Sequence, residues 1–408
     1  MEKLLRGTEK LIPKKVYKFF QPAYHFLLAA TGTIIYRKPS RHIYVIGITG
    51  TKGKSSTTEF VNAVLEGAGK KTAILSTIRF KIGDKARPNK FKMTMPGRFF
   101  TQKFLRDAVD AGCEYAIIEM TSEGARFYRH LGIEMDALIF TNLSPEHIES
   151  HGSFKKYKEA KLRLVRRLAN SKKPVRLSIA NIDNEHAYSF LISPIEKNIG
   201  YSLKKTHILS ESLHESVIEY DGEKITIPLP GKFNISNALA SLTLAKELGI
   251  PTADAKKGIE NLSLIRGRVE KVDVGQSFTV VVDYAHTDDS LRKLYETFSS
   301  SRMIAVLGST GGGRDSWKRP VLGKIADEYC SEIIITNEDP YDEDPMKIIN
   351  EVASGVVNHT PTLIIDRREA IRHAISLAKP GDTILISGKG TDPYIMGPNG
   401  SKQIWDDV

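Results

Sequence analysis

One short stretch constrains the fold of this chain more than any other. Residues 45–59 read VIGITGTKGKSSTTE, an apolar run that ends in a glycine-rich turn and leads into a helix-forming segment. The phosphate-loop pattern G-x-x-x-x-G-K-[ST] matches at Gly53, Lys54 and Ser55, but its first glycine would fall on Ile48. A strand, a turn and a helix in this order place backbone N–H groups and a helix N-terminus around phosphate. The stretch therefore predicts a nucleotide-binding α/β domain.

The residue types in this loop suit particular parts of a nucleotide. The Lys54 ammonium can reach the β and γ phosphates, and the Ser55 hydroxyl can join the ligands of Mg²⁺. The residues that we expect around the phosphates are Gly50, Thr51, Lys52, Gly53, Lys54, Ser55 and Ser56.

Short apolar runs alternate with helical patterns along most of the chain, which is typical of a parallel α/β sheet. Residues 204–230 interrupt this rhythm with a polar, alternating stretch that suits a β excursion, and a second α/β series begins near residue 270. We therefore expect a basic, partly apolar segment over residues 1–41, a central P-loop ATPase domain with a parallel sheet over 42–263, and a C-terminal Rossmann-like α/β domain over 264–408.

Composition excludes several classes. The 408 residues include only two cysteines, Cys113 and Cys330, which argues against a disulfide scaffold and a four-cysteine zinc site and fits a reducing cytosol. The net charge of +11 permits acidic partners without choosing among them. Because no aromatic-basic module accompanies this charge, we expect no nucleic-acid partner.

The N-terminal 41 residues carry nine Lys or Arg against two Glu. Their apolar core, residues 19–36, is interrupted by Pro22 and His25 and is shorter than a bilayer span. A convincing cleavage site is missing, so we predict no signal peptide. Two interpretations stay open: an interfacial helix on anionic membrane, or a helix packed on the domain behind it.

The complete phrase GITGTKGKSSTTE resembles the T-G-T-x-G-K-[ST]-[ST] loop of the Mur ligase superfamily. IIEMTSE, TNLSPEHIESHG and YKEAKLRL resemble further motifs of that family, in the same order. The resemblance implies a ligase that uses ATP to activate a carboxylate as an acyl phosphate, which an amine attacks to form an amide. It also implies Mg²⁺ ligands at Glu119 and His147 beside Ser55, and a CO₂-derived carbamate on Lys161. Glu146 is a conservative departure, since the family pattern has an aspartate at this position.

Lys161 has an independent argument. It lies on a helical stripe whose other members are apolar or aromatic: Phe154, Tyr157, Leu164, Val165 and Leu168. A lysine on a buried face loses the solvation of its ammonium, which favours the neutral amine that reacts with CO₂. The alternative is a lysine that snorkels to water from the edge of that face.

The second half of the chain continues the resemblance. Three stretches resemble family motifs whose residues contact the nucleotide: GKFNISNALAS, RGRVEKV and VVDYAHTDDSL. The resemblance implies such contacts for Asn237, Arg268, Asp283 and His286. GSTGGGRDSWKRP resembles a loop of the cell-wall ligases that add the third residue of the stem peptide. Its Arg314 and Lys318 are the cations that we expect at phosphates or the acyl phosphate.

The same branch supplies expectations for the substrates, an amino acid and a muramoyl-peptide acceptor. Thr94 in MTMPG is expected near the acceptor, with Arg126 or Arg129 at its carboxylates. In NEDPYDEDP, Tyr341 stands where the diaminopimelate enzymes carry an arginine. The acidic Glu338, Asp339 and Asp342 would suit a cationic amine such as lysine, and the alternative is that they are solvated surface carboxylates. The family phrase G-K-G-H-E reads GKGTD here, with Lys389 and Asp392.

Several alternatives remain. The UDP-binding domain of the family is not matched, so we expect either another mode of UDP recognition or an acceptor that is lipid-linked rather than a UDP-sugar. Folylpolyglutamate synthase, the amidating subunit of the lipid II complex and a non-catalytic ATP-binding scaffold are the rival classes. A cytoplasmic monomer is expected, with residues 1–41 at the inner face of the membrane as the open alternative.

Overall fold

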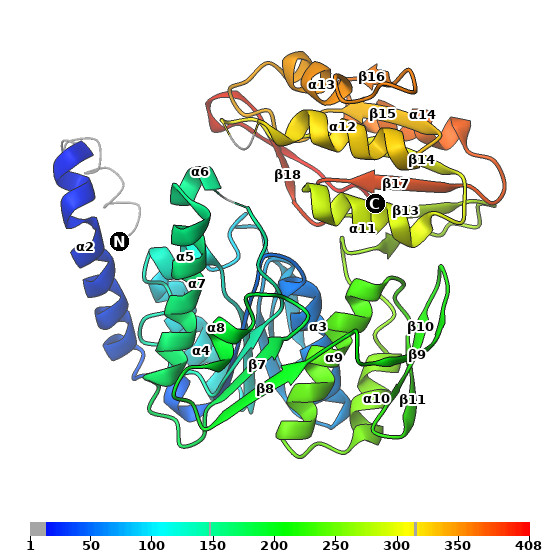
Figure 1. The fold of residues 1–408 in the computed structure, drawn as a ribbon. Coiled ribbons are helices and arrows are strands. Elements are labelled where there is room, and N and C mark those ends of the chain that lie inside the picture. The colour runs from blue at the N-terminus through cyan, green and yellow to red at the C-terminus, as the bar shows by residue number, and fades with distance from the viewer. Residues whose placement is uncertain (1–13, 147, 314–315) are drawn as a thin grey trace. The chain divides into compact units, whose positions relative to one another are not determined.

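The computed structural model describes residues 14–146, 148–313 and 316–408. The chain forms two compact units (Figure 1). Unit 1 comprises Met1–Thr58, Gly69–Ser144 and Phe154–Tyr201, and unit 2 comprises Glu59–Ala68, Pro145–Ser153 and Ser202–Val408. Within the described ranges, none of the helices has the length and apolar character needed to cross a membrane.

Unit 1 is built on one sheet. Its strands are β1 (Tyr44–Thr49), β2 (Thr72–Leu75), β3 (Arg79–Ile82), β4 (Lys85–Pro88), β5 (Tyr115–Glu119), β6 (Ala137–Phe140), β7 (Leu177–Asn181) and β8 (Lys197–Tyr201). They lie in the order β4-β3-β2-β5-β1-β6-β7-β8. From β2 to β8 the neighbours pair in parallel, while β3 and β4 extend the sheet as an antiparallel hairpin. The predicted parallel α/β fold is confirmed.

The central strands of this sheet are apolar runs because helices cover both faces. Five of the six residues of β1 are buried, and β6 is buried throughout. The helices of this unit are α2 (Lys14–Ile35), α4 (Arg98–Asp110), α5 (Ser122–Arg126), α7 (Phe154–Ala169) and α8 (Tyr188–Leu191), with the 3₁₀ turn Pro39–His42 before β1. Helix α3 (Lys54–Gly67) begins in unit 1 and ends in unit 2.

Unit 2 contains a second parallel sheet. Its strands are β9 (His207–Glu211), β10 (Ser216–Tyr220), β11 (Glu223–Ile227), β12 (Glu270–Lys271), β13 (Thr279–Asp283), β14 (Met303–Leu307), β15 (Glu332–Thr336), β16 (Thr362–Ile364), β17 (Thr383–Ser387), β18 (Tyr394–Met396) and β19 (Lys402–Ile404). The main sheet has the order β12-β13-β17-β14-β15-β16, in which only the short edge strand β12 is antiparallel. Strands β9 to β11 form a separate antiparallel sheet.

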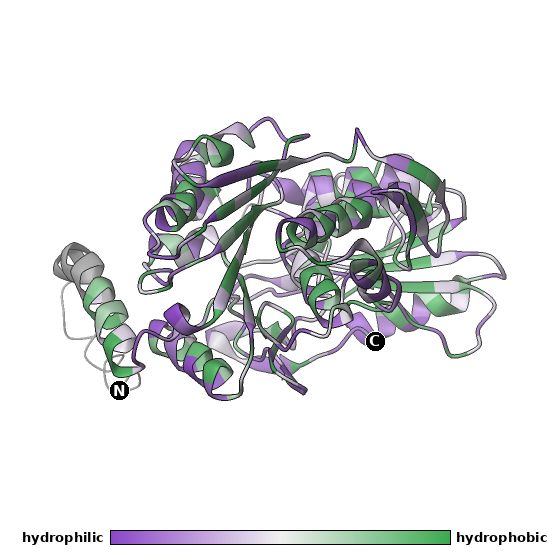
Figure 2. Cartoon of the chain, turned by 90° about the horizontal axis from the view of Figure 1, so that it is seen from below, coloured by the Kyte–Doolittle hydropathy of each residue, from purple (hydrophilic) through white to green (hydrophobic). Residues whose placement is uncertain are grey.

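The helices of unit 2 are α6 (Ile148–His151), α9 (Lys232–Glu247), α10 (Thr252–Glu260), α11 (Asp288–Phe298), α12 (Lys318–Tyr329), α13 (Pro345–Ala353) and α14 (Arg367–Leu377), with a 3₁₀ turn at Pro398–Gly400. Helices α11 to α14 pack on the main sheet, while α9 and α10 pack on the β9–β11 sheet. Figure 2 shows hydrophobic residues concentrated along the strands and on one side of the helices, as two buried sheet faces require. In such sheets, sites form beyond the carboxyl ends of the strands.

Candidate active site

The glycine-rich loop follows β1 directly. Ile48 is fully buried inside this strand and stands opposite Glu119 of β5 in the parallel register. The strand continues to Thr49, and α3 begins at Lys54, so the turn itself spans residues 50–53. The position that the general pattern gives to glycine is therefore a strand position here, where an apolar side chain packs.

Two glycines shape this turn for different reasons. A Cβ on Gly50 would lie 1.9 Å from Thr141 Oγ1, so only a glycine permits this close approach. Gly53 has a φ of 79°, in the left-handed region that glycine adopts at low cost. Asn142 fixes the segment between them, because its backbone O accepts from Thr51 N (2.8 Å) and its Oδ1 accepts from Lys52 N (2.9 Å).

The side chains that open α3 lie where the sequence predicts phosphate chemistry. Lys54 Nζ donates to Gly50 O (3.1 Å) and Thr51 O (2.9 Å), so the ammonium is folded over the loop. The Ser55 hydroxyl donates to Glu119 Oε2 (3.0 Å), which also accepts from Thr77 N (2.9 Å). The oxygens of Ser55 and Glu119 thus lie side by side, and Mg²⁺ prefers oxygen ligands of this kind.

Lys161 is buried in unit 1 and reaches the same loop. It is 2% exposed, so it does not snorkel to water. Its Nζ donates to Gly50 O (2.6 Å) and lies 4.8 Å from the centroid of the Tyr157 ring. The Tyr157 hydroxyl in turn lies 3.0 Å from Thr51 Oγ1. The predicted stripe of α7 therefore faces the phosphate loop.

The predicted metal ligands are only partly described. His147 lies outside the described residues. Among the residues that the structure does describe, no group of three or more His, Cys, Asp or Glu side chains is arranged to hold a metal ion. The oxygens of Ser55 and Glu119 fit Mg²⁺ by their chemistry, and a carbamate on Lys161 would add an anionic oxygen near the same loop.

The residues expected at the acceptor lie at the carboxyl end of the same sheet. Thr94 Oγ1 lies 2.7 Å from Thr77 Oγ1, which links it to Glu119 through the Thr77 backbone. Arg129 donates to Met95 O, and the guanidinium groups of Arg126 and Arg129 lie 5.5 and 5.9 Å from the Phe127 ring centroid. Unit 1 therefore brings the predicted acceptor residues to the edge that carries the phosphate loop.

In unit 2, three of the predicted nucleotide residues surround the end of β13. Asp283 accepts from Val269 N (2.8 Å) and Ala285 N (2.7 Å), and burial raises the pKa of its carboxyl while the Arg268 charge opposes that rise. The Arg268 guanidinium lies 4.5 Å from the Tyr284 ring centroid. His286 Nδ1 lies 2.7 Å from Tyr284 O. Asn237 is buried on α9.

The loop after β14 and the first turn of α12 hold the two cations predicted at phosphates or the acyl phosphate, of which only one is described. Arg314 lies outside the described residues, and Lys318 is buried at the first position of α12. The neighbouring Arg319 is 1% exposed and binds Glu343 (2.9 Å) and Glu351. Because Glu343 also accepts from Gly313 N (2.7 Å), this network ties the loop after β14 to the loop after β15.

The acidic residues after β15 have unequal partners. Asp339 Oδ1 accepts from Lys389 Nζ (2.9 Å), and Lys389 also pairs with Asp392 (3.2 Å). Glu338 is 4% exposed; its Oε1 accepts from Thr310 Oγ1 (2.6 Å), and its Oε2 has no hydrogen-bond partner among the described residues. Glu338 Oε2 is therefore a buried carboxylate oxygen without a hydrogen-bond partner among the described residues, whereas Asp339 Oδ1 is paired with a lysine.

The other predicted residues of this region lie at the same loops. Tyr341 adopts a left-handed backbone with a φ of 53°, and its N–H donates to Met396 O (3.0 Å). Asp342 Oδ1 accepts from Asn399 N (2.7 Å). Sequence reasoning gave no role to Thr77 or Asn142, because each acquires its role from a residue more than 40 positions away. It named Glu338 together with Asp339 and Asp342, but it could not tell which of these carboxylates the fold pairs.

A phosphate loop with a paired serine and glutamate, on a parallel sheet followed by a second α/β sheet, defines the chain as a nucleotide-binding P-loop protein. The Mur ligase middle domain family matches residues 48–245, and the Mur ligase, glutamate ligase domain family matches residues 267–390. The chain belongs to the Mur ligase family and is an ATP-dependent amide ligase. The predicted boundary between residues 263 and 264 falls between the two matches and stays a prediction.

Individual relatives agree with this membership. The chain is 36% identical over 400 residues to UDP-N-acetylmuramyl-tripeptide synthetase from Roseiflexus sp. (strain RS-1), covering 90% of this chain and 78% of the relative. It is 36% identical over 381 residues to UDP-N-acetylmuramoyl-L-alanyl-D-glutamate--2,6-diaminopimelate ligase from Clostridium tetani (strain Massachusetts / E88), covering 90% and 76%. A solved structure of a ligase with that second name matches with a TM-score of 0.61 and 28% identity, covering 90% of this chain and 77% of its own.

Proposed function

We propose that this ligase joins an amino acid to a muramoyl-peptide acceptor in peptidoglycan precursor synthesis. The carboxylate of the acceptor would take the γ-phosphoryl group of ATP to form an acyl phosphate and ADP. The amine of the amino acid would then attack the acyl carbon, forming the amide and releasing phosphate. The observation that carries this proposal is the cluster in which the phosphate loop, Glu119, Lys161 and the Thr94 loop meet at one sheet edge of unit 1.

Within that cluster, each residue has a distinct part. Lys54 binds the phosphates of ATP, and the N–H groups of residues 50–56 cradle them. Ser55, Glu119, His147 and a carbamate on Lys161 would hold Mg²⁺, which neutralises phosphate charge when bound. The carbamate forms when the neutral amine of Lys161 adds to CO₂ and releases a proton. Thr94 and either Arg126 or Arg129 would orient the carboxylates of the acceptor.

Unit 2 would supply the remaining contacts. Asn237, Arg268, Asp283 and His286 are proposed at the nucleotide, and Arg314 with Lys318 at the transferred phosphoryl group. Asp339, Tyr341, Asp342, Lys389 and Asp392 are proposed at the incoming amino acid.

For the amino acid we propose a cationic side chain such as that of lysine. Buried Glu338 supports this choice, since its Oε2 has no hydrogen-bond partner within residues 14–146, 148–313 and 316–408. An ammonium that donates to this oxygen would offset the cost of its burial. Tyr341 stands where an arginine grips the distal carboxylate of diaminopimelate in the ligases of that name, and a phenol cannot form that bidentate ion pair.

For the partners beyond the two substrates, we propose a cytoplasmic monomer whose residues 1–41 touch the anionic inner face of the membrane. The basic composition of this segment supports the contact.

Turnover by the purified chain tests the ligation. ADP release and product mass are measured with UDP-N-acetylmuramoyl-L-alanyl-D-glutamate and with its lipid-linked form, each with lysine or meso-diaminopimelate. Lys54→Ala is the inactive control. An amide product with lysine is expected; ATP binding without turnover in every pairing would sink the proposal in favour of a non-catalytic scaffold.

A further inference from the structure

In the part of helix α2 whose side chains are described, residues 24 and 26–35, the side that holds Ala29 and Gly32 packs on unit 1. Ala29 is 1% exposed, and a Cβ on Gly32 would lie 3.7 Å from Phe99 and Gln102 of α4. Farther along this face, Thr33 lies so close to Gly132 that a Cβ on that glycine would meet Thr33 Oγ1 at 1.8 Å. These contacts fix which side of α2 points away from the unit.

The opposite face of α2 is apolar and exposed. Four large side chains lie on it, with exposed fractions of 55% for Phe26, 61% for Leu27, 68% for Ile34 and 60% for Ile35. Leu27 and Ile34 are seven residues, or about two helical turns, apart and lie on one side of the helix, with Phe26 and Ile35 at its two edges. We call these four side chains the α2 stripe. Figure 2 shows hydrophobic residues along the described part of this helix.

The charge around this stripe has one sign. No Asp or Glu occurs between Glu9 and Glu59. Arg37, Lys38 and Arg41 follow the helix with exposed side chains, and its first five residues include three lysines. On the neighbouring helix α4, Lys103 pairs with Asp107 and Arg106 pairs with Asp110, so both acidic side chains of this helix have a cationic partner. An apolar stripe bordered by cations complements an anionic lipid surface.

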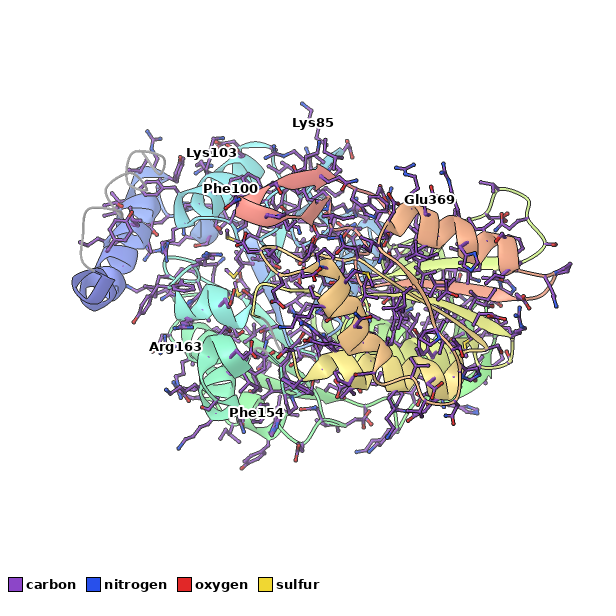
Figure 3. The ribbon with its side chains drawn as sticks, turned by 90° about the horizontal axis from the view of Figure 1, so that it is seen from above. Lys85, Phe100, Lys103, Phe154, Arg163 and Glu369 are labelled. Carbon is purple, nitrogen blue, oxygen red and sulfur yellow. The ribbon has the colours of Figure 1, made fainter. Side chains whose placement is uncertain are left out.

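A second patch of exposed apolar and basic side chains adjoins α4. Phe91 is 52% exposed and packs edge-on against Phe100 of α4, with ring centroids 5.3 Å apart. Met93 is 36% exposed, and Lys85, Arg87 and Lys90 of the adjoining hairpin are exposed. Figure 3 shows Phe100 and Lys103 of α4 and the outward-pointing Lys85.

We infer that the α2 stripe and the Phe91–Met93 patch together form a docking surface for an anionic lipid bilayer. The occupant is a bilayer surface, because the stripe supplies apolar side chains for the interfacial layer and the flanking cations attract acidic headgroups. This surface specifies how the peripheral membrane contact proposed above would be made. Its effect on ligation, but not the docking itself, rests on the proposed function. Since the Phe91–Met93 patch leads directly into Thr94, docking would hold the acceptor loop at the membrane.

Vesicle flotation of the full chain tests this surface. Wild type is expected to float with phosphatidylcholine vesicles that contain phosphatidylglycerol, and to float less as salt is added. A Leu27→Asp/Ile34→Asp double variant is expected to bind at least about tenfold more weakly. Val274→Asp is the matched control, because Val274 is an 87% exposed apolar residue of unit 2.

The thermal midpoint and the ligation rate of the double variant distinguish a loss of docking from a loss of folding or activity. The thermal midpoint and the ligation rate with a soluble acceptor are expected to be the same in the double variant and wild type, which separates docking from the proposed ligation. Wild type that fails to float, or a double variant that floats as well as wild type, overturns the inference. So does a wild-type dimer in light scattering that the double variant abolishes without vesicle binding, since the occupant is then a second copy of the chain.

Discussion

Lys161 Nζ donates a 2.6 Å hydrogen bond to the backbone oxygen of Gly50, although the two residues are 111 positions apart. The contact joins the buried face of α7 to the turn of the phosphate loop. A lysine that served only as packing could be replaced there by an apolar side chain at little cost. A lysine that carries a carbamate could not, because its anionic oxygens would be needed beside Glu119 and Ser55.

Replacement of Lys161 therefore separates these roles. Lys161→Ala is expected to lower kcat by about 100-fold or more while the Kd for ATP changes little, because a group needed for the chemical step rather than for binding is removed. Added short carboxylates are expected to restore part of the rate. ADP release and equilibrium ATP binding are the measurements.

The matched control is Lys155→Ala, since Lys155 is exposed on the same helix. Its rate is expected to equal that of wild type. Undiminished ligation by Lys161→Ala, with no carboxylate added, would remove the carbamate from the proposed site.

Glu119 and Ser55 are expected to set the requirement for Mg²⁺. Glu119→Gln keeps the hydrogen bonds near the strand end but removes the charge, so half-maximal activity is expected at about 10- to 100-fold higher Mg²⁺. Titration of Mg²⁺ at saturating ATP measures the shift. Glu123→Gln, on the exposed side of α5, is the control; an equal Mg²⁺ dependence in both variants would exclude Glu119 as a ligand.

Glu338 is expected to select the amino acid. Glu338→Gln should raise the KM for lysine by about tenfold or more without changing the KM for ATP, because one partner of a buried charge pair is lost. Steady-state kinetics with each substrate varied separately tests this split. Glu369→Gln on α14 provides an exposed control (Figure 3), and a KM for lysine unchanged by Glu338→Gln would place the ammonium elsewhere.

The parallel sheets could be predicted from sequence because their strands are buried on both faces. Strands β1 and β14 therefore read as unbroken apolar runs, each followed by a glycine turn. Helical periodicity also places Lys161 on the stripe of Tyr157 and Leu164. Periodicity alone leaves open a lysine that snorkels to water, and the 2% exposure of Lys161 decides for burial.

The pairing of charges could not be predicted in this way. Arg319 looks like a solvated cation in a basic loop, yet it is enclosed and held by two glutamates from other elements. Asp339 looked available for a ligand, but its partner Lys389 lies 50 positions later. Such partners depend on which loops the sheet order brings together, and local sequence carries no record of that order.

The free energy of unfolding at low pH is expected to depend on Asp327, which accepts hydrogen bonds from the loop after α13. Its carboxylate accepts from the backbone N–H groups of Val357, Asn358 and His359 and pairs with the His359 ring. Burial alone would raise the pKa of the Asp327 carboxyl, but the His359 ring and the backbone bonds outweigh it and lower the pKa from 3.8 to about 2. Because the folded pKa lies below the unfolded one, this stabilisation is complete above pH 4 and is lost as the pH falls toward 2.

Urea unfolding at several pH values measures this linkage. Asp327→Asn is expected to lower the free energy of unfolding at pH 7 by about 1–3 kcal/mol and to weaken its dependence on pH between 4 and 2. A variant with the wild-type pH dependence would show that other carboxyl groups determine acid stability.

Two neighbouring aspartates near the chain's last residue offer a sharper comparison. Asp407 forms a bidentate pair with Arg367 (2.7 and 2.8 Å), and both side chains are fully buried. Asp406 pairs with Arg266 at 2.8 Å, but its side chain is 53% exposed. The two pairs join the same residue types at similar distances, but the Asp407 pair is bidentate and buried, whereas Asp406 is exposed and Arg266 also pairs with Glu270 (3.0 Å).

Removal of each carboxylate is therefore expected to have unequal effects. Asp407→Ala leaves the Arg367 guanidinium buried without its counter-charge, so the free energy of unfolding of unit 2 is expected to fall by about 3–5 kcal/mol. Asp406→Ala should cost about 1 kcal/mol or less, because water solvates Arg266 in its place. Chemical denaturation of the two variants measures the difference. Equal losses would mean that the Asp407 pair contributes no more than a surface contact, and that Arg367 finds another partner once Asp407 is gone.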